Sequence, residues 1–170
     1  MTQSEHDEAD IAEARGWLDA AGDGAVAGLI ESVFAESAAE IAERGPACWA
    51  SGRCCNFGAS GHRLYVTGLE AAYTVRRLTS PLQLVSLAAA NERDGCPFQA
   101  AHLCTVHTIT PLACRTYFCD RSATAWQHAL TERGVERLRT IHDLHGVPYR
   151  YAEWRWLLGV LIAAGDAPAS

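Results

Sequence analysis

Cysteines carry most of the chemistry that this sequence offers. The chain has seven of them in 170 residues, and Cys54 and Cys55 are adjacent. Grouped thiolates are soft ligands that suit zinc ions and iron–sulfur clusters. The seven fall into two clusters, which are Cys48, Cys54 and Cys55 in the first and Cys96, Cys104, Cys114 and Cys119 in the second. The pattern predicts that all seven thiols are metal ligands.

The spacing of these cysteines differs from that of a simple zinc site. A structural zinc ion takes four ligands, usually as two pairs whose members stand two to four residues apart. Here Cys48 precedes the adjacent Cys54 and Cys55, and seven thiols exceed the need of one four-ligand site. Adjacent cysteines rarely reach one small ion with good geometry, which favours a polynuclear centre or two metal sites. We therefore expect an iron–sulfur cluster, with zinc as the alternative.

Disulfide bonds are the competing explanation for grouped cysteines. Seven cysteines in 170 residues amount to about 4%, below the roughly 8 to 10% of disulfide scaffolds, and an odd count leaves one unpaired. The segment Met1 to Asp10 is polar and acidic and has no features of a signal peptide. We therefore expect a reducing, cytoplasmic location, where metal binding is the commoner use of grouped cysteines.

The length and the net charge of the chain limit the classes of protein to which it can belong. A chain of 170 residues is typical of one domain of about 100 to 200 residues. The formal net charge of −6 disfavours nonspecific binding to nucleic acid or to anionic membranes, because both need a basic surface. The longest apolar run, Trp156 to Ala164, is too short for a bilayer, which needs about 20 residues. A protein partner or a redox enzyme is the expected binding partner.

The patterning predicts a mainly α fold, a single helical domain with a small β-hairpin and cysteine-rich metal-binding loops. Residues 1–45 are expected to be helical, 46–121 to form the cysteine-cluster region, and 122–165 to be helical again. Asp23 is a plausible helix N-cap, and Gly45-Pro46 ends that helix just before the first cysteine. The final helix carries an apolar stripe at helical spacing, made of Trp154, Leu157, Leu158, Leu161 and Ile162.

Several local signals predict the boundaries in the central region. Thr67 to Glu70 and Ser80 to Gln83 both match a capping box, and each predicts a helix of about ten residues. β-Branched residues between Leu103 and Ile109 predict a short strand, paired with Leu64 to Thr67 in what would be the only sheet. The C-terminal helical pattern is expected to break near Gly134 and again at Gly146 to Pro148.

The central region resembles the YkgJ-like cysteine-cluster proteins, a family described as zinc- or iron-chelating. Its pattern runs C-x2-C-x2-C-C, then C-P-[FL], C-[ST]-[IV]-[YH], a proline turn and C-R-x-[FY] with a final cysteine. The matching pieces are Cys48 to Cys55, Cys96-Pro97-Phe98, Cys104 to His107, Pro111 and Cys114 to Cys119, and Glu70 matches an acidic residue that opens a helix. The resemblance covers about residues 48 to 120 and implies metal binding.

One position departs from that pattern, because Ser51 stands where the family carries its second cysteine. Either the missing ligand is dispensable, or Ser51 ligates weakly, or His107 replaces it. Flagellin lysine methylases contain a similar cysteine region, which leaves a tailoring enzyme as a further alternative. The chain has no S-adenosylmethionine fingerprint, however, and no nucleophile–histidine–acid triad is evident. Whether it is an enzyme therefore stays open, and its catalytic residues stay unassigned.

The remaining candidates have ordinary structural explanations. His62, His102 and His107 flank the cysteines. Each is expected to be an ordinary hydrogen-bonded histidine, with a role as metal ligand as the alternative. His142 and His145 are three residues apart on a predicted helix, a spacing that can hold a metal. Arg115 follows Cys114 and either stabilises thiolate charge or forms a surface ion pair. Further arginines and glutamates of the same C-terminal helical region predict a solvated, ion-paired face, made of Glu132, Arg133, Glu136, Arg137 and Arg139.

Overall fold

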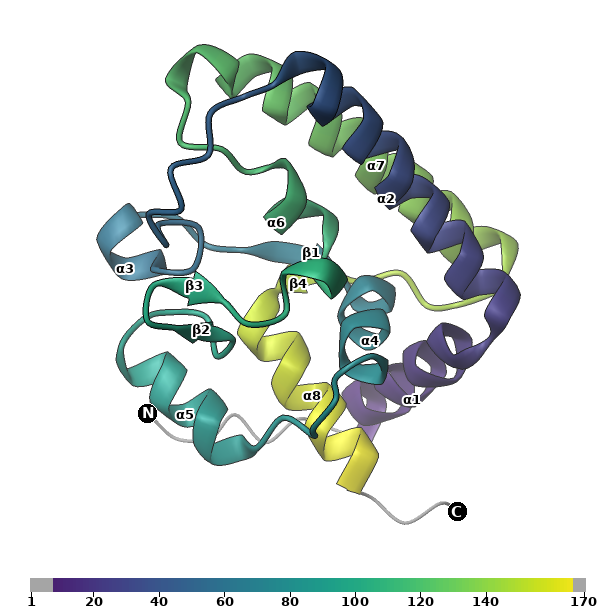
Figure 1. Cartoon of the computed structure of the whole chain (residues 1–170). Coiled ribbons are helices and arrows are strands. Elements are labelled where there is room, and N and C mark those ends of the chain that lie inside the picture. Colours follow the sequence, from purple (N-terminus) through teal and green to yellow (C-terminus); the bar gives the residue numbers. More distant parts are fainter. Residues whose placement is uncertain (1–7, 167–170) are drawn as a thin grey trace.

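Two long helices stand beside a smaller, more compact group of elements (Figure 1). The structure is a computed structural model that describes residues 8–166. In chain order its elements are α1 (Glu8–Gly22), α2 (Gly24–Arg44), α3 (Phe57–Ser60), β1 (Tyr65–Thr67), α4 (Gly68–Arg76), α5 (Leu84–Glu92), β2 (Gln99–Ala100), β3 (Leu103–Cys104), η1 (His107–Ile109), α6 (Leu112–Thr116), η2 (Arg121–Ala123), α7 (Thr124–Leu144), β4 (Tyr151–Glu153) and α8 (Trp154–Asp166). The predicted mainly α class is confirmed, although residues 1–7 of the predicted N-terminal helical region lie outside the described residues.

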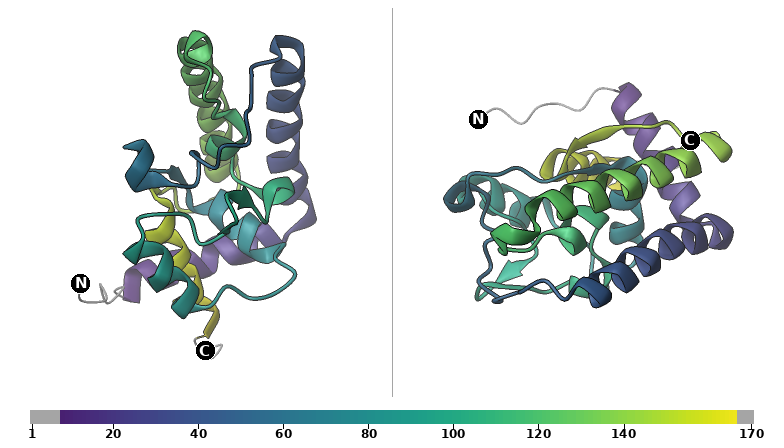
Figure 2. Two further views of the ribbon diagram at one scale, coloured as in Figure 1. Left: turned by 60° about the vertical axis from the view of Figure 1, so that its left-hand side comes forward. Right: turned by 90° about the horizontal axis from the view of Figure 1, so that it is seen from above.

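The long helices α2 and α7 run antiparallel and side by side, and both project from the rest of the molecule (Figure 2). The ends of α2 follow the predicted signals. The side chain of Asp23 accepts hydrogen bonds from the amides of Ala25 and Val26, and Gly45 ends the helix with a left-handed φ of 62°. Arg133 and Arg137 of α7 form ion pairs with Glu40 and Glu36 of α2. Two arginines of the predicted charged face of α7 are therefore paired across the two helices.

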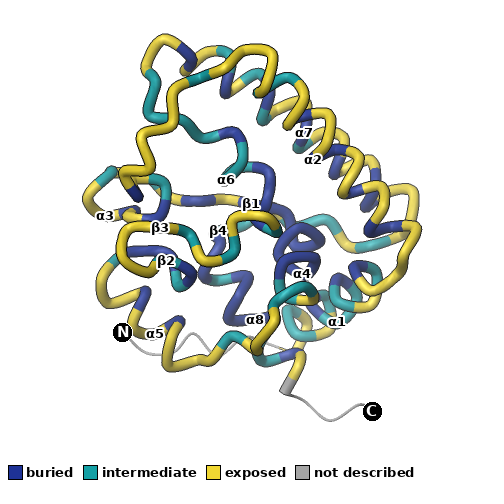
Figure 3. The backbone as a smooth tube through the Cα atoms, in the orientation of Figure 1, coloured by how far each residue is buried: buried dark blue, intermediate teal, exposed yellow. Residues whose placement is uncertain are grey.

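The core lies where α4 and α8 pack together, and Figure 3 shows both helices as mostly buried backbone. The apolar stripe of α8 is buried as predicted, except that Ile162 is only half-buried. Helix α1 packs against α4 through Trp17, which is fully buried. A Cβ at Gly68 would lie 2.4 Å from the Trp17 indole, so this close approach requires glycine.

The helix starts in the central region follow the sequence signals only in part. The capping box at Thr67 is present, because the Thr67 hydroxyl accepts from the Glu70 amide and the Glu70 carboxylate accepts from the Thr67 amide. The second predicted capping box is wrong. Helix α5 begins at Leu84, and its N-cap residue Gln83 makes no capping hydrogen bond. Leu82 packs against the core from the segment before the helix, and this tertiary contact outweighs the local signal.

The predicted strand pairing is also wrong. Strand β1 pairs antiparallel with β4, with Tyr65 opposite Glu153, whereas β2 and β3 form a separate local hairpin. Only the first two residues of the predicted 103–109 strand are extended, and residues 107–109 form the 3-10 helix η1. The partner of β1 is a three-residue strand that lies far away in the sequence and directly before α8. So short a strand carries no alternating pattern that would reveal it.

The predicted break at Gly134 is wrong as well, because α7 continues through it to Leu144. Gly134 is buried, and a Cβ there would lie 2.3 Å from Cδ2 of Leu112 in α6. The glycine therefore lets α6, which carries Cys114, pack closely on α7. The second predicted break is confirmed, since the chain leaves the helix at His145 and Gly146 has a φ of 62°. No helix in residues 8–166 combines the length and apolar character needed to cross a membrane.

Candidate metal centre

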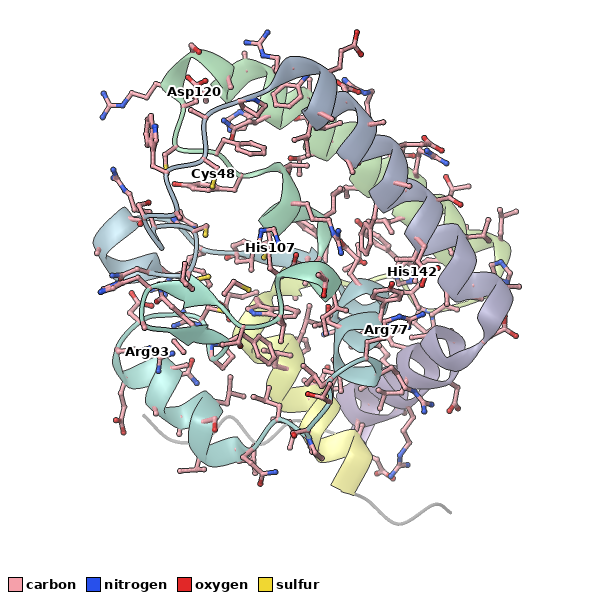
Figure 4. The ribbon with its side chains drawn as sticks, in the orientation of Figure 1. Cys48, Arg77, Arg93, His107, Asp120 and His142 are labelled. Atoms are coloured by element: carbon pink, nitrogen blue, oxygen red, sulfur yellow. The ribbon has the colours of Figure 1, made fainter. Side chains whose placement is uncertain are left out.

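Five of the seven cysteines come together from three separate segments of the chain. Cys54 and Cys55 lie in the turn before α3, Cys96 and Cys104 flank the β2–β3 hairpin, and Cys114 lies in α6. Figure 4 shows sulfur atoms gathered between α3 and this hairpin. We call Cys54, Cys55, Cys96, Cys104 and Cys114 the five-thiol cluster.

Backbone hydrogen bonds fix the first segment against the hairpin. The amide of Cys96 donates to the Cys55 carbonyl at 2.8 Å, and the Gln99 side chain donates to the Gly52 carbonyl at 3.0 Å. The Cys55 amide donates back to that same Gly52 carbonyl at 3.1 Å, which closes the turn before α3. Gly52 has a φ of 72°, and a Cβ there would lie 2.5 Å from the His102 carbonyl oxygen. The turn that presents the adjacent cysteines therefore depends on glycine at this position.

Cys55 lies at the centre of the cluster. Its Sγ is 4.0 Å from Sγ of Cys54. Hydrogen bonding from Cys55 lowers the pKa of Cys54 to about 6 and that of Cys104 to about 7. The pKa of Cys55 itself is raised, first by Cys104 and then by Cys54 and Cys96. Three thiols thus surround Cys55, which keeps its proton while its neighbours are favoured as thiolates, the form that binds metals.

Cys96 and Cys114 complete the cluster from the buried side. Hydrogen bonding to Cys55 lowers the pKa of Cys96 despite burial. Burial raises the pKa of Cys114 most, and negative charge on Cys96, Cys104 and Cys54 raises it further. Cys114 therefore lies close enough to the other sulfurs for their negative charge to raise its pKa. Several neighbouring thiolates can all stay ionised only if a cation compensates them.

Trp154 lies against the cluster and offers an unused donor. Its indole Nε1 is buried without a hydrogen-bond partner, and its side chain is only 1% exposed. The same indole lowers the pKa of Cys96, although less than Cys55 does, so it faces that sulfur. An N–H that points at a thiolate can donate to the cysteine sulfur or to a sulfide beside it. The apolar stripe of the final helix predicted a packing role for Trp154, and no local signal marks its contact with Cys96.

The two remaining cysteines lie outside the five-thiol cluster. Cys48 is exposed in the segment that leaves α2, and Figure 4 shows it near Asp120 at the start of α7. Cys119 is half-buried, and its Sγ lies 3.6 Å from the hydroxyl of Ser51. Within residues 8–166, no interaction joins Cys48 or Cys119 to one of the five thiols. The position that departs from the family pattern is thus beside Cys119 and not beside Cys55.

The candidate histidines do not gather with the sulfurs as a group. The Nε2 of His62 lies 3.3 Å from the Cys54 carbonyl oxygen, and its ring stacks on Tyr117. His102 and His107 are exposed. His142 is buried and His145 is exposed at the end of α7, so these two do not share a site.

Arg115 and Arg93 support the backbone around the cluster. Arg115 donates from Nε to the Thr110 carbonyl at 2.7 Å and from Nη2 to the Thr108 carbonyl at 2.9 Å, and it packs over the Phe34 ring. Burial lowers the pKa of Arg115, and negative charge on Tyr73 and then on Cys114 opposes this shift. The surface ion pair that was the alternative does not form among the described residues. Arg93 donates to the Cys96 carbonyl at 2.5 Å.

In residues 8–166, no set of three or more histidine, cysteine, aspartate or glutamate side chains is already spaced to hold a metal ion. Two sulfurs that share a tetrahedral zinc at 2.3 Å lie roughly 3.8 Å apart, close to the 4.0 Å between Cys54 and Cys55. The thiol chemistry therefore fits a metal, and binding requires the other side chains to rotate inward.

Comparison with known proteins found no match to a family model, to a curated protein or to a solved structure.

Proposed function

We propose that the chain binds an iron–sulfur cluster through the five-thiol cluster and serves a redox or accessory role for a partner enzyme. The observation that carries the proposal is the convergence of five mutually interacting thiols from three segments. Four thiolates suffice for a common iron–sulfur cluster, so one thiol is in surplus. When bound, such a cluster supplies one-electron transfer, and the surrounding residues hold its ligands and limit contact with water.

The buried indole of Trp154 supports a metal-bound thiolate or sulfide beside Cys96. Hydrogen bonds to cluster and ligand sulfurs help to set reduction potentials, and a buried donor without a partner is costly unless something accepts from it. A sulfide or a thiolate beside Cys96 would accept that hydrogen bond. Trp154 is held in place by its position at the start of α8 and by Phe98, whose ring centroid lies 6.0 Å away.

A zinc site with a structural role is the second candidate. It is favoured by the grouping of three thiols around Cys55, four sulfurs in all, and by the Cys54 to Cys55 separation, which suits a shared tetrahedral ion. In that case the metal would join the α3 turn to the hairpin and stabilise the fold, and the helices would present a surface to a partner.

Metal and sulfide analysis of anaerobically purified protein tests the proposal. We expect iron together with acid-labile sulfide, and visible absorption that bleaches on reduction. Zinc has a filled d shell and gives no such colour. A colourless preparation that contains stoichiometric zinc and no sulfide, obtained with ample iron in the medium, would reject the iron–sulfur assignment and select zinc.

Serine variants test which thiols hold the metal. Cys55→Ser and Cys104→Ser should lose most of the metal and lower the melting temperature, because both thiols belong to the five-thiol cluster. Cys48→Ser is the matched control, since Cys48 is exposed and outside that cluster, and its metal content should be unchanged. Equal metal loss in all three variants would contradict the assignment of ligands.

A further inference from the structure

A second feature lies beside the five-thiol cluster without sharing its ligands. A pocket of about 290 Å³ opens between α6, the start of α7 and the turn that carries Arg53. One face of α7 forms its wall, because residues 124, 127, 128 and 131 follow helical spacing and all line it. Figure 4 shows Asp120, which also lines the pocket, where the chain enters α7.

The pocket is lined by two arginines that have no carboxylate partner among the described residues. Arg53 and Arg121 both face it, and neither forms an ion pair with any residue in 8–166. Exposed His128 adds a third basic group. Seven of the fourteen arginines form no ion pair within residues 8–166, and Arg53 and Arg121 are the two of these that line the pocket.

Asp120 is the one carboxylate of the described residues that lines the pocket, and it already accepts hydrogen bonds within the protein. Asp120 accepts from the Ser122 amide at 2.9 Å and from the Ser122 hydroxyl at 2.6 Å. Hydrogen bonding from the Ser122 side chain and amide lowers its pKa most, and the Ala47 amide and the charge of Arg44 contribute further. Asp120 therefore caps the start of η2 and ties it to the segment after α2. Arg53 and Arg121 remain available to a ligand.

The walls are held rigidly, so the pocket exists before a ligand arrives. Buried Gln127 accepts from the Phe118 amide at 2.9 Å and donates to the Phe118 carbonyl at 3.2 Å. Across the floor, the hydroxyls of Thr116 and Thr131 lie 2.7 Å apart, so one donates to the other, and each also lies within hydrogen-bonding distance of a backbone carbonyl. Preformed walls reduce the ordering cost of binding.

We infer that this pocket binds a small phosphate monoester, with the phosphoryl group held by Arg53 and Arg121. The planar guanidinium group matches the oxygens of a phosphoryl group with two parallel hydrogen bonds. The volume of about 290 Å³ lies at the lower end of ligand sites, which span roughly 300 to 1,000 Å³, and so suits a small molecule. The inference goes beyond the proposed metal function, because none of the five thiols lines the pocket.

Calorimetric titration of the purified, metal-containing protein with orthophosphate at constant ionic strength tests this site. We expect one saturable site per chain, and a loss of affinity of at least about tenfold in Arg53→Gln and in Arg121→Gln. Arg139→Gln is the matched control, because it removes the same charge from α7 roughly 16 Å further along the helix than His128. Its affinity should stay within about twofold of the unaltered chain.

A second readout uses Cys119, which lines the pocket, and Cys48, which does not. Orthophosphate should slow alkylation of Cys119 by a maleimide while leaving the rate at exposed Cys48 unchanged. Absence of saturable binding, equal loss in the Arg139→Gln control, acetate binding as tightly as phosphate, or an unprotected Cys119 would each overturn the inference. None of these outcomes depends on which metal the protein contains, so the two proposals fail separately.

Discussion

At the scale of single residues, Glu70 joins two elements that the metal centre needs. Its carboxylate is 1% exposed and accepts from the Thr67 amide at 2.9 Å, the Thr67 hydroxyl at 2.8 Å and the Leu112 amide at 2.8 Å. Burial raises the pKa of Glu70, while the donors at Thr67 and Leu112 lower it. The residue thus caps α4 and also fixes the start of α6, two residues before Cys114.

Glu70→Ala should lower the free energy of unfolding by at least about 3 kcal/mol, because three buried donors lose their acceptor and each costs about 1 kcal/mol or more. Glu70→Gln should fall between the alanine variant and the unaltered chain, since one acceptor oxygen remains. Glu132→Ala removes an exposed carboxylate from α7 and should change stability by less than about 0.5 kcal/mol. Urea denaturation measures all three. An effect of Glu70→Ala as small as that of Glu132→Ala would contradict this role.

At the scale of elements, the close packing of α6 on α7 places Cys114. Leu112 is fully buried, and its Cδ2 occupies the space that a side chain at Gly134 would need. The two helices are also joined by the 2.7 Å contact between the hydroxyls of Thr116 and Thr131. A helix of five residues has little stability of its own, so α6 depends on these contacts with α7.

Gly134→Ala should lower the free energy of unfolding by about 1 to 3 kcal/mol, because the added methyl group overpacks against Leu112. Gly28→Ala is the matched control within α2, where a Cβ would meet nothing within 4 Å. There the same change should stabilise the protein by about 0.5 to 1 kcal/mol through helix propensity. Chemical denaturation of both variants checks the opposite signs, and stabilisation by both would disprove the close approach.

At the scale of the whole molecule, His142 joins distant parts of the chain. Its Nδ1 lies 3.0 Å from the Pro148 carbonyl oxygen, which also accepts from the Trp17 indole at 2.8 Å. This carbonyl therefore links α1, the end of α7 and the segment that leads to β4. The imidazole is fully buried, and its Nε2 has no hydrogen-bond partner among the described residues. Burial lowers the pKa of His142.

The free energy of unfolding should consequently decrease as the pH falls. The unfolded histidine has a pKa of about 6.5, whereas the folded value is lower, so below that pH the unfolded chain binds more protons. The contribution of neutral His142 is complete above about pH 6.5 and is lost as the pH falls towards the folded pKa. Denaturation at pH 7.5 and 5.5 should show a smaller pH effect in His142→Gln than in His145→Gln, which alters an exposed histidine. Equal pH effects in the two variants would refute the argument.

The sequence by itself determined the features that depend on neighbouring residues. The mainly α class follows from apolar spacing, and the ends of α2 follow from Asp23 and Gly45. The capping box at Thr67 was predictable for the same reason, because its hydrogen bonds join residues three positions apart. The grouping of cysteines also indicated soft-ligand chemistry, since that depends on residue type alone.

Only the tertiary structure decided which distant segments meet. It paired β1 with β4, used Gly134 for packing where a break was predicted, and separated Cys48 and Cys119 from the five-thiol cluster. It also placed Trp154, from the start of α8, against Cys96. Such contacts depend on the summed burial of many side chains across the core, and no local pattern encodes which partner a short strand or a single sulfur will find.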